Sequence, residues 1–136
     1  MSAEPRASAA PRVLVVDDYQ DGADSLMLIL RALGADARAV YDGETALRAV
    51  AEFKPDLMFL DLGLPGLSGL EVAAAIRRLD LEAPVRLFAL SGRSQDEARG
   101  QSLDAGFEDY LMKPVALETV MRVLASAGPQ ASAPAP

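Results

Sequence analysis

The sequence predicts an α/β fold in which helices flank a parallel sheet. Short apolar runs of strand length alternate with stretches of helical period, the pattern of strands joined by crossover helices. Most of these runs are apolar throughout, as expected for strands buried on both faces of a parallel sheet. The length of 136 residues fits one domain with a single core.

Two strands and two helices are expected in the first part of the chain. An apolar strand at 13–16 precedes a helix that follows Asp21 and ends at Gly34, a residue typical of the position just past a helix. The strand 37–40 alternates small apolar and polar residues, which suits a sheet edge. The second helix ends before Pro55. The residues predicted to face the sheet are Leu26, Ile29, Leu30 and Leu33 in the first helix and Ala46, Leu47, Val50 and Ala51 in the second.

Three strands and three helices are expected in the second part. Apolar strands lie at 57–60 and 87–90, and a short one ends at 111–112. The third helix spans about 68–79, after a turn with the sequence Leu-Pro-Gly. The fourth, at 94–106, has few apolar residues and an internal glycine, so it is predicted to open most easily. The inward residues are Leu70, Ala73, Ala74 and Ile76 in the third helix and Leu117, Val120, Met121 and Leu124 in the fifth.

Composition limits where the protein works. Residues 1–11 and 127–136 are rich in Ala, Pro and Ser and are predicted to be disordered tails around a domain at 12–126. Apolar stretches are interrupted by charges well before the roughly 20 residues of a membrane span. The start does not resemble a secretory signal. We therefore expect a cytoplasmic protein without a membrane partner.

Composition also limits the chemistry. Cysteine and histidine are absent, which excludes disulfides, thiolates and an imidazole base and leaves oxygen as the available metal ligand. The net charge of -7 would repel a nucleic-acid backbone. We therefore expect hard cations such as magnesium as cofactors, and no nucleic-acid partner.

Polar side chains suited to phosphoryl chemistry follow four of the predicted strands. They are Asp17 and Asp18, Asp61, Ser91 and Lys113. Because the carboxyl ends of parallel strands share one edge of the sheet, these side chains should converge there. Clustered carboxylates raise one another's pKa, which favours a bound metal ion. The convergence predicts a magnesium site.

Asp61 is the candidate nucleophile, because it lies at the mouth of a central buried strand. Attack by an aspartate on a phosphoryl group gives an acyl phosphate, and an ammonium and a hydroxyl could cover the phosphoryl oxygens. Lys113 and Ser91 could supply them. In the alternative interpretation, Asp17 and Asp18 only cap the first helix, Ser91 is a turn serine and Lys113 is solvated.

These residues, in this order, resemble the receiver domain of two-component response regulators over roughly residues 12–124. The matching segments are 15–18, 61–69, 90–92 and 110–114. The resemblance implies a flavodoxin-like sandwich with a five-stranded parallel sheet in the order 2-1-3-4-5 and five helices. It also implies that Asp61 receives a phosphoryl group from a phosphohistidine on a histidine kinase or histidine phosphotransfer protein.

The resemblance assigns further roles at the site. Asp18 and Asp61 would bind Mg²⁺ (or Mn²⁺), with Asp17 holding it through water and Gly63 adding its backbone carbonyl. Lys113 would pair with the phosphoryl group. Ser91 and Tyr110 would be the switch residues that change the surface of helix four, strand five and helix five, where a downstream protein or a second copy would dock. The peptide between Lys113 and Pro114 is often cis in this family.

Several functions remain open at this level. The leading interpretation is a single-domain response regulator without its own output domain, which catalyses only its own phosphorylation and dephosphorylation and is otherwise not an enzyme. It could also be a phosphorelay intermediate, a phosphate sink or a receiver module from a hybrid histidine kinase. A phosphorylation-independent docking module is a further alternative, which the complete set of site residues disfavours. A haloacid-dehalogenase phosphatase is disfavoured because the first strand lacks an Asp-x-Asp pair. A flavodoxin is disfavoured because the first loop is acidic.

Overall fold

The computed structural model describes residues 10–81, 83–92 and 106–127 of the chain. The strands are β1 (Arg12–Val16), β2 (Asp36–Val40), β3 (Leu57–Asp61), β4 (Arg86–Ser91) and β5 (Asp109–Met112). The helices are α1 (Gln20–Ala32), α2 (Gly43–Phe53), α3 (Gly69–Arg77) and α5 (Leu117–Ala127). The predicted fourth helix falls mainly on residues outside the described ranges, as do the predicted tails except for a few boundary residues.

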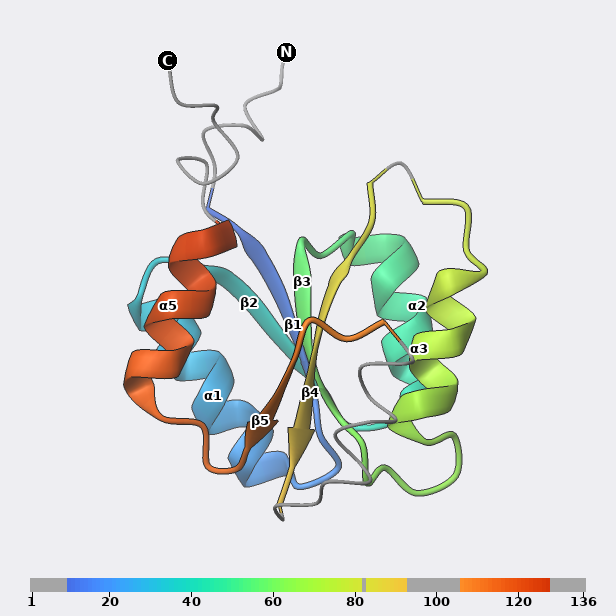
Figure 1. Cartoon of the computed structure of the whole chain (residues 1–136), viewed down its shortest axis with the longest axis horizontal. Helices are drawn as coiled ribbons and strands as arrows, with labels where there is room; N and C mark the ends of the chain where they lie inside the picture. Colours follow the sequence, from blue (N-terminus) through green and yellow to red (C-terminus); the bar gives the residue numbers. More distant parts are fainter. Residues whose placement is uncertain (1–9, 82, 93–105, 128–136) are drawn as a thin grey trace.

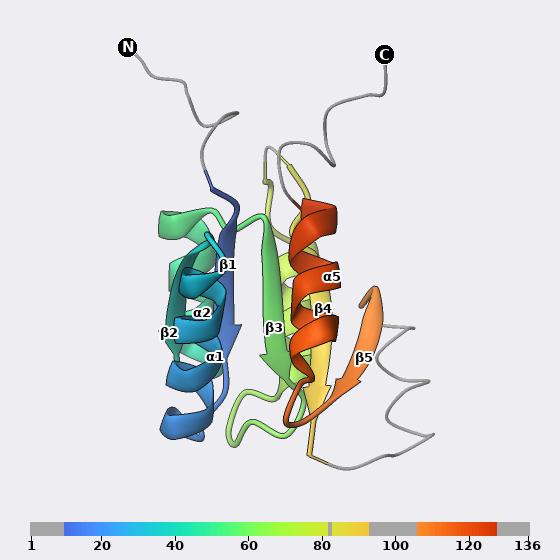
Figure 2. The same cartoon turned by 90° about the vertical axis from the view of Figure 1, so that its left-hand side faces the viewer.

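The five strands form one parallel sheet in the order β2-β1-β3-β4-β5. Helices α1 and α5 cover one face of this sheet, and α2 and α3 cover the other (Figure 1). The predicted α/β class and the strand order are therefore confirmed. The carboxyl ends of β1, β3, β4 and β5 point to the same end of the sheet (Figure 2).

Two apolar cores hold the three layers together, one on each face of the sheet. The core under α1 and α5 includes Val13, Phe59 and Leu90, and the core under α2 and α3 includes Leu14, Leu60 and Phe107. The residues alternate between the two cores along each strand because successive side chains point to opposite faces. All five residues of β3 are buried, which places its last residue, Asp61, in a desolvated position.

Local sequence explains where the helices end. Gly34 has φ +102°, in the left-handed region that a glycine adopts without steric cost, and it follows the end of α1 as predicted. Ser68 caps α3 through a reciprocal pair of hydrogen bonds with Glu71. Asp42 caps α2 by accepting a hydrogen bond from the Thr45 amide, and Lys54 ends that helix before Pro55.

Some predicted boundaries and faces are wrong. Helix α1 begins at Gln20, before Asp21, and α3 ends at Arg77, two residues early. The buried stripe of α3 is made of Gly69, Val72, Ala73 and Ile76, so Val72 replaces Ala74, which is exposed. Other residues predicted to face inward are exposed as well: Ile29, Leu33 and Ala51, and in α5 Leu117 and Met121, where Val123 is buried instead. The reason is that each helix buries a narrower stripe than its apolar residues could cover.

Candidate functional site

Four strands deliver the predicted site residues to one edge of the sheet. Asp17 and Asp18 follow β1, Asp61 ends β3, and Ser91 ends β4. Lys113 directly follows β5. The predicted convergence is confirmed for the three carboxylates, which have oxygens within 4.8 Å of one another, and for Lys113, which contacts Asp17 and Asp61.

The three carboxylates form a compact cluster. One oxygen from each of Asp17, Asp18 and Asp61 lies within 4.8 Å of the others. Asp17 and Asp61 are buried, at 3% and 5% exposure, whereas Asp18 is exposed. The N-cap residue of α1 is Tyr19, which makes no side-chain cap, and Asp17 accepts hydrogen bonds from the Tyr19 amide and from Lys113, an arrangement that favours a role in the cluster over helix capping alone. Hard oxygen ligands, one of them open to solvent, suit a magnesium ion that keeps several waters.

Lys113 provides the positive charge nearest to this cluster. Its Nζ lies 2.9 Å from Asp17 Oδ2 and 3.3 Å from Asp61 Oδ2. Burial alone would lower the pKa of Lys113. The hydrogen bond to Asp17 and the charges of both aspartates outweigh burial and raise the pKa. The ammonium therefore stays protonated between two buried acids, where it can also meet a bound anion.

The pKa of Asp61 is raised. Its main cause is burial, and the hydrogen bond and negative charge of neighbouring Asp17 add to it. The Gly63 amide and the Lys113 charge act in the opposite direction without cancelling the effect. A carboxylate held in this way gains from a divalent cation, so the donor set fits Mg²⁺.

Backbone amides orient both buried aspartates, a feature that our sequence analysis missed. The Gly63 amide donates to Asp61 Oδ1 at 2.9 Å, and the Tyr19 amide donates to Asp17 Oδ1 at 3.0 Å. Both are Asx turns, in which an aspartate accepts from the amide two residues later. These turns could have been predicted from the sequence, because each aspartate stands where a strand passes into a loop. Each turn fixes one oxygen and leaves the other facing the cluster.

The two predicted switch residues lie on the β4 and β5 side of the site. Ser91 follows Leu90, which is the register partner of Asp61, and it is half-buried. Tyr110 is half-buried against the core under α2 and α3. The Lys113 amide donates to the Ser91 carbonyl at 2.7 Å, and the peptide between Lys113 and Pro114 is cis, as the resemblance implied.

An apolar pocket of about 430 Å³ adjoins the cluster between α1 and the residues that follow β5. Asp17 and Lys113 form part of its wall, while Leu26 and Val115 are among its apolar residues. Ile29 and Tyr19 also line it and are 39% and 64% exposed. The pocket therefore joins exposed apolar surface to the charged site.

The fold and this edge define a flavodoxin-like α/β domain with an acidic, lysine-bridged site. Residues 13–125 match the family described as the response regulator receiver domain. The chain belongs to this family. The receiver prediction is thereby confirmed.

Known proteins give the same result. The transcriptional regulatory protein PrrA of Mycobacterium tuberculosis is 44% identical over 117 residues, which cover 85% of this chain and 49% of that protein. The DNA-binding response regulator MtrA of Mycobacterium leprae is 41% identical over 103 residues, covering 76% and 44%. A CheY-like receiver domain from Methylobacillus flagellatus superposes with a TM-score of 0.77 at 30% identity, covering 88% of this chain and 99% of that one.

These relatives overturn one expectation. The chain spans about half the length of the curated relatives it matches, and MtrA is named as DNA-binding. This conflicts with our prediction that the protein has no nucleic-acid partner, so we withdraw it. The net charge of -7 is that of this chain of 136 residues and does not include the further half of such longer regulators. Within the described residues, no helix has the length and apolarity needed to cross a membrane.

Proposed function

We propose that Asp61 accepts a phosphoryl group from a phosphohistidine on a histidine kinase or histidine phosphotransfer protein. The observation that carries this proposal is the placement of Asp61, which is buried at a strand end, in contact with Lys113 and within a cluster of three carboxylates. In the transfer, a carboxylate oxygen of Asp61 bonds to phosphorus as the bond from phosphorus to the donor imidazole nitrogen breaks. The imidazole leaves with the electron pair.

Each residue of the site has one task in this reaction. Mg²⁺, when bound, neutralises charge on the phosphoryl oxygens, and Asp18, Asp61 and the Gly63 carbonyl would hold it, with Asp17 acting through water. Lys113 would exchange its contact with Asp61 for one with the transferred group. Ser91 would donate a hydrogen bond to a phosphoryl oxygen. These groups stabilise charge and position the reactants, which is what a loose transition state requires.

The donor would approach over the apolar pocket. The pocket shares Asp17 and Lys113 with the site, and its exposed residues Tyr19 and Ile29 offer apolar area beside the reacting groups. A protein partner that covers this surface would bring its phosphohistidine to the edge of the sheet and exclude water there.

Phosphorylation would then change a protein-binding surface. Ser91 would move toward the phosphoryl group and Tyr110 would follow, so that β5 and α5 present a new surface to a downstream protein or a second copy. We further propose that the protein acts in the cytoplasm and catalyses only its own phosphorylation and dephosphorylation. The absence of an output domain stays a prediction, and the mass of the protein isolated from its native cells would test it.

Intact-mass analysis tests the proposal. The native chain and Asp61→Asn are each incubated with acetyl phosphate, with and without magnesium. We expect one phosphoryl group on the native chain only, and only with magnesium. If no adduct forms and magnesium leaves the Tyr19 fluorescence unchanged, the alternative of a docking module that works without phosphorylation takes its place.

A further inference from the structure

Helix α3 begins directly against the phosphoacceptor. Its first residue, Gly69, lies so close to the Asp61 carbonyl that a Cβ at this position would collide with the backbone of Asp61 and Leu62. Only glycine permits this approach. The reciprocal cap between Ser68 and Glu71 fixes the same end of the helix. A displacement of the Asp61 backbone is therefore passed to α3 through direct contact.

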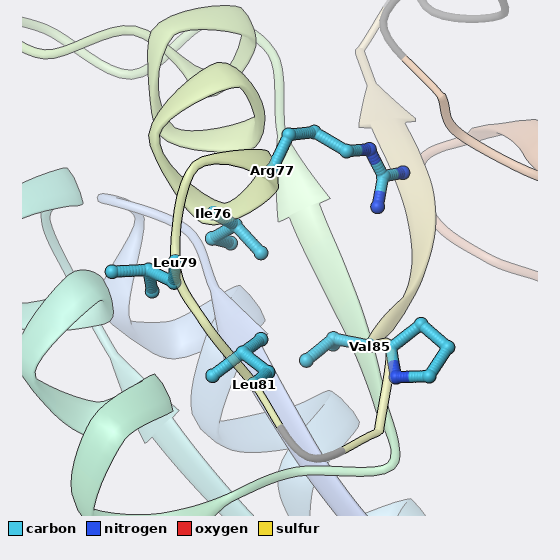
Figure 3. A pocket seen from close by; sticks show the side chains of 6 residues that line it. Ile76, Arg77, Leu79, Leu81 and Val85 are labelled. Atoms are coloured by element: carbon cyan, nitrogen blue, oxygen red, sulfur yellow. The ribbon is translucent and has the colours of Figure 1, made fainter.

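The other end of α3 is bonded to the segment that enters β5. Arg77 Nη2 donates to the Gly106 carbonyl at 2.5 Å. Gly106 has φ +94°, a backbone conformation that favours glycine, and the Arg77 guanidinium packs closely against its Cα. In Figure 3 the Arg77 side chain extends from the end of α3 away from Ile76, Leu79 and Leu81. The Arg77 side chain thus connects two segments that lie 29 residues apart in the sequence.

Gly106 is the first of three consecutive anchored residues. Phe107 is buried in the core under α2 and α3. The Glu108 amide donates to the Leu87 carbonyl at 2.7 Å, and its carboxylate accepts two hydrogen bonds from Arg86, at 2.7 and 2.9 Å. Strand β5 follows at once and carries Tyr110. Because β5 pairs only with β4 in the described sheet, its position depends on these anchors.

The packing around the end of α3 leaves room for movement. A pocket of about 200 Å³ lies beside this end and is lined by Ile76, Arg77, Leu79, Leu81, Pro84 and Val85 (Figure 3). Its apolar side chains do not fill the space between α3 and the start of β4. The start of α3 lies in tight contact with the Asp61 backbone, whereas a pocket adjoins its end, so there is space for a small shift at the end of the helix.

We propose that α3 is a rigid link from Asp61 to β5, with Arg77 as the positioning residue that completes it. The inference rests on the proposed phosphorylation of Asp61. A nine-residue helix spans about 13 Å, enough to carry a shift from one edge of the sheet toward the other. This route reaches Tyr110 from the amino-terminal end of β5, independently of Ser91 at the opposite end.

Hydrogen exchange of the amides of residues 107–110 tests this link in the full chain. Arg77→Gln removes the guanidinium, and Arg78→Gln is the matched control, because Arg78 is an exposed arginine at the same end of α3. In the resting protein we expect these amides to exchange about tenfold faster in Arg77→Gln, as for the loss of one hydrogen bond to a charged group. We expect no change in Arg78→Gln. Thermal unfolding verifies folding, and Arg77→Lys replaces Arg77→Gln if the latter unfolds.

The same samples are measured with acetyl phosphate and magnesium, and the adduct is quantified by mass. We expect the adduct in equal yield in all chains. The change in exchange at 107–110 should appear in the native chain and Arg78→Gln and be lost in Arg77→Gln. Two results would overturn the link. One is a phosphorylation-dependent change in exchange at 107–110 that is as large in Arg77→Gln as in the native chain. The other is an exchange rate at these amides in unphosphorylated Arg77→Gln that equals the native rate. If the native chain forms no adduct, the proposed function is overturned. The exchange rates of the unphosphorylated chains then still show whether the hydrogen bond from Arg77 to Gly106 holds the start of β5 in place.

Discussion

The two ends of the sheet differ in how their charged side chains are buried and paired. At the carboxyl end, three clustered aspartates share one ammonium, and two of the aspartates are buried. At the amino end, Arg86 and Glu108 form a one-to-one pair with side chains 32% and 43% exposed. Paired, solvated charges are stable without further partners. The unbalanced buried charges at the carboxyl end would gain from a cation, so of these two charged groups this one suits a ligand.

The pKa shifts express the same contrast. The pKa of Asp61 is raised, mainly by burial and then by Asp17, so its charged form opposes folding in the absence of a metal ion. The pKa of Glu108 is lowered, mainly by its hydrogen bonds with Arg86, so its charged form favours folding. Neutralising Asp61 and neutralising Glu108 should therefore change stability in opposite directions.

Removal of Lys113 should have the largest effect. Lys113→Met deprives both buried aspartates of their positive partner. We expect phosphorylation by acetyl phosphate to slow about 100-fold or more, as when one electrostatic stabiliser is lost. Stability without magnesium should fall by about 2 kcal/mol, since a partly buried pair is broken. Intact-mass kinetics and urea unfolding measure the two effects. Arg122→Met, an exposed site on α5, removes the same charge and should leave both unchanged.

Magnesium should stabilise the chain through the carboxylate cluster. At a concentration 100 times the Kd, a ligand specific to the folded state adds about 2.7 kcal/mol to the free energy of unfolding. We expect this gain in the native chain and in Asp21→Asn, an exposed acid of α1 outside the cluster. Asp18→Asn should lose most of it. An equal gain in Asp18→Asn, measured by thermal unfolding, would place the ion elsewhere.

Asp61→Asn should stabilise the protein without magnesium. Because the folded-state pKa of Asp61 is raised, ionisation of this carboxyl costs stability above that pKa, and the amide avoids the cost. We expect the unfolding temperature at neutral pH to rise by several degrees and the gain to vanish as the pH falls below the ordinary aspartate pKa of about 3.9. A fall in the unfolding temperature of Asp61→Asn at neutral pH would contradict the view that ionised Asp61 is an unbalanced buried charge.

Glu108→Gln should have the smallest effect, of the opposite sign. Its depressed pKa means that ionised Glu108 contributes stability above the ordinary glutamate pKa, and that this contribution is lost as pH falls through the folded-state pKa. Since the pair is solvated, we expect a loss of at most about 1 kcal/mol at neutral pH and none in acid. Urea unfolding at both pH values measures it, with Glu52→Gln on the exposed face of α2 as the control.

The sequence predicts the sheet and the site edge better than it predicts helix faces. Buried parallel strands are continuous apolar runs, so their carboxyl ends, and with them Asp61 and Ser91, can be located from the sequence. The predicted inward face of a helix is wrong where the helix has more apolar residues than it buries. In α3, Val72 and Ala74 are both apolar, and only the packing against α2 and the sheet decides which is buried.

The long-range polar contacts away from the site edge could not be predicted. Arg77 and Gly106 are 29 residues apart, and Arg86 and Glu108 are 22 residues apart. Each pair forms only because the fold brings the amino end of β5 beside α3 and β4. Nothing in the sequence distinguishes Arg77 and Arg86, which make these contacts, from Arg78, which is exposed. By contrast, the Asx turn of Asp61 and Gly63 is local and could have been found from its spacing.

The most direct test of the central claim is to locate the phosphoryl group. The native chain is phosphorylated with acetyl phosphate and magnesium, reduced with borohydride and digested, because borohydride converts an aspartyl phosphate to homoserine. Our account predicts homoserine at position 61 and unmodified aspartates at 17 and 18. Asp61 ends the fully buried strand β3 and lies farther from Lys113 than Asp17 does, at 3.3 Å against 2.9 Å, whereas Asp18 is exposed. Homoserine at Asp17 or Asp18 with an unmodified Asp61 would contradict it.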